Sequence, residues 1–397
     1  MRRAIRFFGW LAFVLIALIA VAWWAARPSA PDAFYTLSQS PPSAAGELLR
    51  HEPFDRNVPP GARAWRILYT TTRIEGVPAI ASAIVMVSEK ASTEPRPIVA
   101  WTHGTTGITP GCGPSVLSDP FLYVPALESL LEQGWIYVAT DYVGLGTAGP
   151  HPYLVGDGEA RSTLDAVRAV RKIEELEVSD RTVVWGHSQG GHAAIWTGIL
   201  APTYAPDVTI DGVAAIAPAT DLRGLIERIQ HTPVGRIMSS YVLQAYSKAF
   251  PDVSFDAYAS GWSKVMALDM AGRCLEGFKI LFSLGEAFAA RGTIFDSPPT
   301  SGSLGERLAQ NSPNMPVTQP LLIAQGDDDD LVLPDVQARF VQQRCAAGQS
   351  LEFMRYVGRD HISIVAPDSA LTGDLVEWTQ QRLARTATPG GCREERR

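Results

Sequence analysis

The feature that most constrains the fold is a short apolar run that leads into a serine between glycines, residues 182–194. It predicts a strand, a tight turn at Ser188 and the start of a helix, in the G-x-S-x-G pattern. A serine whose Oγ stands clear of a sheet needs a strained turn, so the positions two before and two after it need minimal side chains. Gly186 and Gly190 meet that need, and Gly191 lets the helix pack closely. The pattern predicts a nucleophilic serine beside the N–H groups of a helix N-terminus, with a purely structural turn as the alternative.

Strand-like and helix-like segments alternate along most of the chain. Short apolar runs predict strands, and apolar residues at helical spacing predict helices. Such alternation favours an α/β fold, with a mostly parallel central sheet flanked by helices on both faces. The expected strands, besides the one before Ser188, are residues 66–72, 77–87, 98–101, 135–140, 213–217, 320–325 and 351–357. The expected helices, besides the one after Ser188, are residues 123–133, 157–175, 334–347 and 371–383.

The alternation stops between residues 220 and 316, where helical segments such as 224–230 and 273–290 replace strand-like runs. We expect an inserted helical cap, because such insertions commonly cover an active site. A separately folding domain is the alternative. The predicted organisation is a linker and N-terminal extension at 28–60, a core of 61–219 and 317–397, and a cap of 220–316.

Residues 1–27 predict a signal anchor or a signal peptide. Three arginines precede an uncharged run, residues 7–26, that is long enough to cross about 30 Å of hydrocarbon as a helix. The arginines predict a cytoplasmic N-terminus, and Trp23 and Trp24 suit the far interface. Pro31 follows the small residues that could form a cleavage site and disfavours cleavage, so an anchor is favoured over a cleaved peptide. In either case we expect the catalytic part outside the cytoplasm.

The composition argues against several classes of function. A net charge of −7 over 397 residues gives no sign of a nucleic-acid partner. The cysteines include no C-x-x-C pair, so we expect neither a metal site nor a dithiol redox motif. We also expect no cofactor. An even number of cysteines outside the cytoplasm predicts two disulfides, for which three pairings are open. The four are Cys112, Cys274, Cys345 and Cys392.

A serine nucleophile needs a histidine base and a carboxylate that orients it. In the α/β-hydrolase fold the order along the chain is serine, acid, histidine. Downstream of Ser188, His192 lies one helical turn beyond the nucleophile and His231 lies within the expected cap. His361 follows the last expected strand, on a loop at the carboxyl edge of the sheet, and is the predicted base. The remaining histidines near the motifs are expected in supporting or loop positions: His103, His151 and His187.

The acid is expected just past the strand at 320–325, where residues 327–330 are four consecutive aspartates. Like charges raise one another's pKa, so one side chain should point inward while the others face water. The usual loop is G-x-x-D followed three residues later by an apolar residue, here Val332, and this register selects Asp329. Asp330 and Asp328 remain alternatives. A calcium loop is a further reading of the run, but the EF-hand spacing of glycine and ligands is absent.

The oxyanion hole needs two backbone donors directed at the developing negative charge. The N–H of Gln189, directly after the nucleophile, is the first. We expect the second from the loop after the strand at 98–101, where Thr105 is the first choice and Thr106 the second. A plain glycine turn is the alternative reading of that loop.

Together these motifs resemble the secretory lipase family of α/β-hydrolases. The resemblance is carried by HGTTG with downstream CGPS, by DYVGLG and HPYL, by GHSQGG, and by the acid loop and GRDH. It implies a Ser-Asp-His esterase that acts on acylglycerols or other carboxylic esters, with a helical cap over an acyl pocket. It also implies that Cys112 pairs with Cys274, which would tie the cap to the loop after the oxyanion strand, and that Cys345 pairs with Cys392.

The sequence therefore predicts a membrane-associated or exported serine ester hydrolase. Its expected partners are a lipid or small ester substrate and, through the N-terminal helix, a membrane. A peptidase or amidase and an acyltransferase share the same constellation and stay open as alternatives. A catalytically inactive, anchored binding protein is an alternative from another class. Acyl-chain preference depends on how the cap packs, and oligomeric state has no signature in the sequence.

Overall fold

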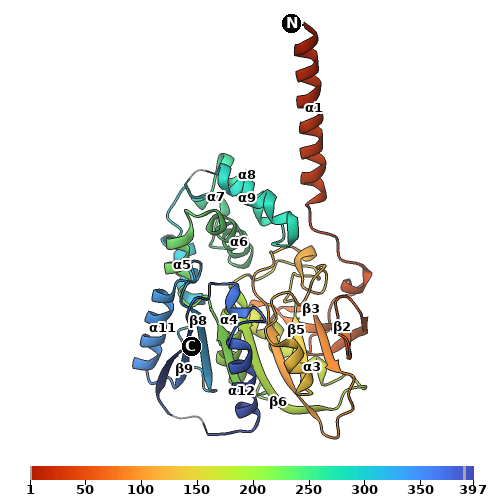
Figure 1. Cartoon of the computed structure of the whole chain (residues 1–397), viewed down its shortest axis with the longest axis vertical. Helices are drawn as coiled ribbons and strands as arrows, with labels where there is room; N and C mark the ends of the chain where they lie inside the picture. The colour runs from red at the N-terminus through yellow and green to blue at the C-terminus, as the bar shows by residue number, and fades with distance from the viewer. Residues whose placement is uncertain (1, 291, 388–389) are drawn as a thin grey trace.

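The computed structural model describes residues 2–290, 292–387 and 390–397 (Figure 1). In this part of the chain one ten-stranded sheet has the order β1-β2-β3-β5-β4-β6-β7-β8-β9-β10. The first four strands in this order pair antiparallel, and all pairs from β5 to β10 are parallel. The strands are β1 (Leu48–Phe54), β2 (Ala62–Thr72), β3 (Pro78–Ser88), β4 (Arg96–Thr102), β5 (Ile136–Thr140), β6 (Val178–His187), β7 (Thr209–Ile216), β8 (Leu321–Gly326), β9 (Leu351–Tyr356) and β10 (Cys392–Arg396).

Helices cover both faces of this sheet, as the alternation predicts. In β4, Ile98 and Ala100 face one apolar layer, whereas Val99 and Trp101 face the other. Successive strand residues point to opposite faces, so a strand buried on both sides reads as a continuous apolar run. The first layer contains α3 (Gly156–Val170), α4 (Gln189–Tyr204) and α11 (Pro334–Ala346), and the second contains α2 (Leu127–Glu132) and α12 (Leu371–Leu383).

A group of helices is inserted between β7 and β8. It shares an apolar core with Tyr153 and Leu154 of the sheet domain, so the two parts pack directly on each other. The helices are α5 (Leu222–Ile229), α6 (Pro233–Ala249), α7 (Phe255–Tyr258), α8 (Gly261–Ala271), α9 (Ile280–Ala289) and α10 (Gly302–Asn311). The helix expected over 273–290 is wrong in its first part, because α9 begins only at Ile280. Before it, the Leu275 N–H bonds the carbonyl of Thr106 and Cys274 forms a disulfide, so the backbone there follows the core rather than a helix.

Two edge strands lie outside the predicted set. The segment 28–60, expected as a linker and extension, contains β1, which pairs with β2. At the other edge β10 pairs with β9, and Cys392 at its start forms a disulfide with Cys345 of α11. All five side chains of β10 are exposed, so no apolar pattern marks this strand.

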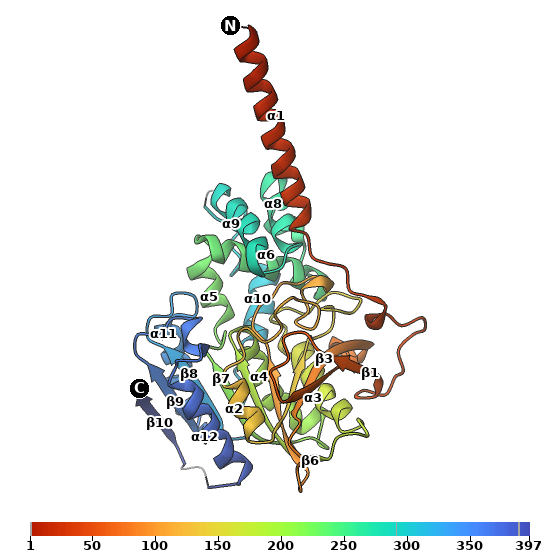
Figure 2. The ribbon, with the colours of Figure 1, turned by 45° about the vertical axis from the view of Figure 1, so that its right-hand side comes forward.

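The N-terminal helix α1 (Arg2–Ala25) projects from the body of the molecule at the end where α8 and α9 lie (Figures 1 and 2). Its segment Arg6–Ala25 is long and apolar enough to cross a membrane, a test that signal sequences also pass. Within the described residues it is the only helix that meets this criterion.

Candidate active site

Ser188 occupies the turn between β6 and α4, with a φ of 58° in the left-handed region. A Cβ at Gly186 would collide with the carbonyl oxygen of Gly190 and with Thr102 Oγ1 of β4. A Cβ at Gly190 would collide with the backbone of Thr102. Strand, turn and helix pass too closely for side chains at either glycine, which is the steric demand expected of such a strained turn.

Ser188, His361 and Asp329 form a continuous series of hydrogen bonds. The distance from Ser188 Oγ to His361 Nε2 is 2.9 Å, and from His361 Nδ1 to Asp329 Oδ2 it is 2.8 Å. The histidine follows β9 and the aspartate follows β8, so both reach the turn because the carboxyl ends of parallel strands share one edge. With Nδ1–H donated to the carboxylate, Nε2 is the ring nitrogen that accepts the serine proton.

The carboxylate of Asp329 is held on all sides by donors. Its Oδ1 accepts the backbone N–H groups of Leu331 (2.9 Å) and Val332 (2.8 Å). Its Oδ2 accepts Nε2 of Gln325 (3.1 Å) as well as the His361 ring. These donors satisfy both oxygens of a side chain that is only 3% exposed.

The three other aspartates of this run point elsewhere. Asp327 forms ion pairs with Arg355 (2.7 Å) and Arg396 (2.9 Å), while Asp328 and Asp330 are exposed. The structure therefore brings one aspartate of the run to the histidine, and it is the residue that the loop register selects.

Gln189, directly after Ser188, is fixed by a buried polar network. Its Nε2 donates to Glu159 Oε1 (2.7 Å) and to the ring nitrogen Nε2 of His151 (3.0 Å). The other oxygen of Glu159 lies 3.1 Å from His192 Nδ1, and His192 Nε2 donates to the carbonyl of Asn311 at 2.8 Å. Both ring nitrogens of His192 thus face acceptors. Glu159 is fully buried and was not among the predicted site residues.

The other histidines near the motifs are supporting groups. His187 Nε2 contacts the carbonyl of His361 at 2.8 Å, and burial, aided by the nearby His361, lowers its pKa to about 3. Burial also lowers the pKa of His103 to about 4 and that of His151 to about 3. These rings are neutral at pH 7 and act as uncharged hydrogen-bonding partners. His231 is exposed between α5 and α6, and His192 bonds Glu159 rather than Ser188.

The loop after β4 passes beside the serine turn. A Cβ at Gly104 would meet the His187 carbonyl at 3.3 Å and Ser188 Cβ at 3.6 Å. Thr105 is held by its hydroxyl, which lies 2.9 Å from Tyr153 OH. Thr106 has a buried hydroxyl without a hydrogen-bond partner in the structure. The backbone at Gly104 thus lies directly against the turn that carries Ser188.

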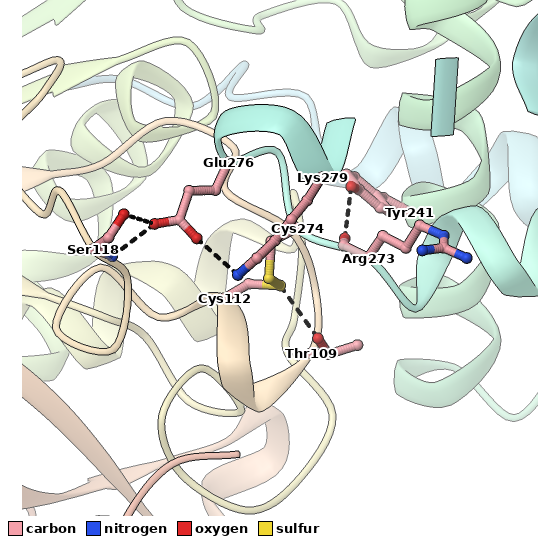
Figure 3. The surroundings of a disulfide bond; sticks show 8 residues. All are labelled: Thr109, Cys112, Ser118, Tyr241, Arg273, Cys274, Glu276 and Lys279. Atoms are coloured by element: carbon pink, nitrogen blue, oxygen red, sulfur yellow. Dashed lines mark hydrogen bonds and ion pairs between the residues drawn. A yellow bond between two sulfur atoms is a disulfide. The ribbon is translucent and has the colours of Figure 1, made fainter. Parts of the chain in front are cut away.

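The Cys112–Cys274 disulfide joins this loop to the inserted helices (Figure 3). Glu276 extends the connection, because it accepts the Ser118 N–H at 2.6 Å and pairs with Lys279 at 3.1 Å. The disulfides Cys112–Cys274 and Cys345–Cys392 are the two pairs that the resemblance implies. Among the described residues, no group of three or more histidine, cysteine, aspartate or glutamate side chains is arranged to hold a metal ion.

A mostly parallel sheet, with a serine on the turn after one strand and its histidine and aspartate on later loops, defines the α/β-hydrolase fold. Solved structures of lipases and esterases have similar folds. Lipase A of Candida antarctica in its closed state superposes with a TM-score of 0.74 at 19% identity, covering 91% of this chain and 87% of the other. The rice cell wall degrading esterase of Xanthomonas oryzae superposes with a TM-score of 0.67 at 18% identity, covering 86% and 98%.

The chain belongs to the secretory lipase family, whose sequence model matches residues 123–391. A secreted triacylglycerol lipase of Malassezia globosa is 26% identical over 97% of this chain and 90% of its own length. Membership in this family makes the protein a carboxylic ester hydrolase. The disulfides and the apolar N-terminal helix fit a catalytic part outside the cytoplasm.

Proposed function

We propose that this protein hydrolyses acylglycerols or related carboxylic esters through an acyl-enzyme on Ser188. The observation that carries the proposal is the series of two hydrogen bonds from Ser188 through His361 to Asp329. His361 Nε2 takes the hydroxyl proton as Ser188 Oγ attacks the ester carbonyl, and Asp329 stabilises the imidazolium. The imidazolium then protonates the leaving alcohol as the C–O bond breaks. Water, deprotonated by the same histidine, releases the acid and restores the serine.

The oxyanion formed in each step is bound by the backbone N–H groups of Gln189 and Thr105. The first is at the N-terminus of α4, where unpaired N–H groups and the helix dipole favour negative charge. The hydrogen bonds of the Gln189 side chain to Glu159 and His151 hold that residue in place. The contact of Thr105 with Tyr153 does the same for the second donor.

The substrate class follows from the family and from the region over the site. A relative named as a triacylglycerol lipase supports an acylglycerol substrate. Residues 220–316 act as a cap on a core of residues 61–219 and 317–397, because their apolar core is shared with Tyr153 and Leu154 of the sheet domain. Amide hydrolysis and acyl transfer to an alcohol use the same constellation and are the alternatives.

The N-terminal helix is retained as a membrane anchor, with the catalytic part on the extracytoplasmic side. The arginines before the apolar run orient it with the N-terminus in the cytoplasm. Two disulfides support oxidising surroundings for the rest of the chain. Alkaline extraction of membranes tests this: an anchored chain stays in the pellet at its full mass, whereas a shortened chain in the soluble fraction would contradict it.

The test of the reaction compares p-nitrophenyl butyrate with a peptide p-nitroanilide. We expect turnover of the ester by the wild-type chain, loss of at least about 10³-fold in kcat for Ser188→Ala, and little turnover of the anilide. Asp328→Asn, an exposed position in the acid loop, is the matched control and should retain wild-type kcat. Anilide turnover without ester turnover would overturn the proposal.

A further inference from the structure

Helices α8 and α9 expose large apolar side chains along one side of each helix. On α8 these are Trp262, Val265 and Leu268, three residues apart, and on α9 they are Leu281 and Phe288, two turns apart. Trp262 is 74% exposed and Phe288 70%. We call these five residues the α8–α9 surface. Each exposed side chain of α9 is apolar, and the remaining exposed position is a glycine. Grouped exposure of this kind marks an interaction surface rather than chance.

Helices α8 and α9 lie at the end of the molecule where α1 leaves the body (Figures 1 and 2). Arg273, just past α8, donates to the carbonyl of Trp23 at 3.4 Å and lies 5.1 Å from the centre of that ring. The segment after α1 packs closely against the loop that contains Gly111, because a Cβ at Gly111 would collide with the carbonyl of Ser29. Residues 27–31, residues 109–111 and part of α8, including Leu268, line one shared cavity.

Arg273 makes the end of α1 and the two helices one unit. This arginine is only 2% exposed and forms ion pairs with Asp269 of α8 (2.7 Å) and Glu286 of α9 (4.0 Å). Its carbonyl accepts the hydroxyl of Tyr241 at 2.9 Å (Figure 3). The next residue, Cys274, carries the disulfide to the loop after β4. Arg273 therefore links α8 and α9 to the end of α1, and the disulfide links the same segment to the loop after β4.

We propose that the α8–α9 surface inserts into the extracytoplasmic face of the same bilayer that α1 spans, and that the enzyme draws its ester substrate from that bilayer. The proposal rests on the ester hydrolysis and anchoring proposed above. A lipid surface fits better than a second protein, because the span and the surface share one end of the molecule and any membrane around α1 borders α8. Trp23, with the Arg27 guanidinium 4.5 Å from its ring centre, places an aromatic and a cation at that border.

The first test locates the surface directly. The native cysteines are all in disulfides, so Phe288→Cys can carry one environment-sensitive fluorophore on the full-length chain in phosphatidylcholine vesicles. Thr93→Cys, in the exposed turn before β4 at the opposite edge of the sheet, is the matched control. We expect spin-labelled phosphatidylcholine to quench the label at 288 at least threefold more than the label at 93. Equal quenching at the two positions would overturn the proposal. It would also be overturned if quenching of the label at 288 decreased as the protein concentration rises, which would indicate that a second copy of the chain covers the surface.

The second test separates the surface from the catalytic machinery. Leu281→Ser with Phe288→Ser removes two exposed side chains of α9, and Leu122→Ser removes an exposed leucine elsewhere. Each is assayed on 4-methylumbelliferyl butyrate in solution and on 4-methylumbelliferyl oleate in phosphatidylcholine vesicles. We expect the double variant to lose tenfold or more on the oleate while its rate on the butyrate and its Tm stay at wild-type values, and the control to keep both rates.

The outcomes of the second test are distinguishable. Wild-type chain inactive on both esters would contradict the proposed function itself. Activity on the butyrate without activity on the oleate in vesicles would leave that function intact and overturn the use of bilayer substrates. Equal oleate rates for the wild type and the double variant would overturn the role of the α8–α9 surface.

Discussion

The run of four aspartates after β8 divides into one buried side chain and three that face arginine or water. The division follows from the loop, because the backbone N–H groups of Leu331 and Val332 converge on Asp329 alone. A buried carboxylate without such donors would cost several kcal/mol, which explains why its neighbours stay outside. Position in the loop rather than residue type therefore determines which aspartate meets His361.

This division predicts different effects for the same substitution at neighbouring positions. Asp329→Asn should lower kcat on p-nitrophenyl butyrate by about 10³- to 10⁴-fold with little change in KM, because the histidine loses its orienting carboxylate. Asp330→Asn, at an exposed position, should retain wild-type kcat. Steady-state kinetics of the two variants test which aspartate is the catalytic acid. A large loss of kcat in Asp330→Asn with no loss in Asp329→Asn would reverse the assignment.

Glu159 is a buried carboxylate that contacts the side chains of Gln189 and His192. A glutamine there keeps the shape but offers Gln189 Nε2 a neutral acceptor in place of a carboxylate, which weakens a buried hydrogen bond. We expect Glu159→Gln to lower the free energy of unfolding by about 1–2 kcal/mol. We also expect about a tenfold lower kcat with an unchanged KM, measured well below the Tm. Glu132→Gln, at an exposed position of α2, is the control. Lower stability with a wild-type kcat would show that Glu159 has a structural role only.

At the scale of elements, the sequence was sufficient to predict the strands and helices that a local pattern of apolar residues determines. The buried strands and α12 were predicted because continuous apolar runs and helical spacing survive in any context. β1 and β10 were missed because they are edge strands, defined by pairing with β2 and β9 rather than by an apolar pattern. Ser188, Asp329 and His361 could be selected from motif and chain order. Glu159 could not, because no short motif marks a single carboxylate buried by the packing of α3 against α4.

The Cys112–Cys274 disulfide is the covalent link between the loop after β4 and the inserted helices, and its removal should destabilise both. Replacing both cysteines with serine should lower the free energy of unfolding by about 2–5 kcal/mol, because the bond closes a loop with a sequence separation of 162. The matched comparison is Cys345→Ser with Cys392→Ser, which opens a separation of 47 and releases only the edge strand β10. Chemical denaturation measures both. A larger loss of unfolding free energy on removal of Cys345–Cys392 than on removal of Cys112–Cys274 would contradict the linking role of Cys112–Cys274.

At the scale of the whole molecule, the carboxyl edge of the sheet, the inserted helices and the end of α1 form one connected body. Neutral buried histidines are part of that body, and they make its stability depend on pH. Burial holds the pKa of His103 at about 4 and those of His151 and His187 at about 3, below the ordinary value of 6.5. Through these three groups the unfolded chain therefore binds more protons than the folded chain below about pH 6.5.

This difference predicts acid sensitivity with a definite sign. The free energy of unfolding should fall as the pH is lowered from about 6.5 toward 4, by up to about 1.4 kcal/mol per pH unit for each of the three histidines. It should change little through these groups above pH 7, where they are neutral in both states. Denaturant titrations at pH 7, 6, 5 and 4 measure the slope, and stability that rises with acidity over this range would contradict the prediction.

The central claim is that Ser188 is the nucleophile of an ester hydrolase, and active-site labelling tests it most directly. The full-length chain is treated with a fluorophosphonate, and the modified peptide is identified by mass spectrometry while ester hydrolysis is followed in parallel. We predict one phosphonyl group on Ser188, loss of activity in proportion to labelling, and no labelling of Ser188→Ala. Labelling at another residue, or full activity with Ser188 modified, would contradict the mechanism.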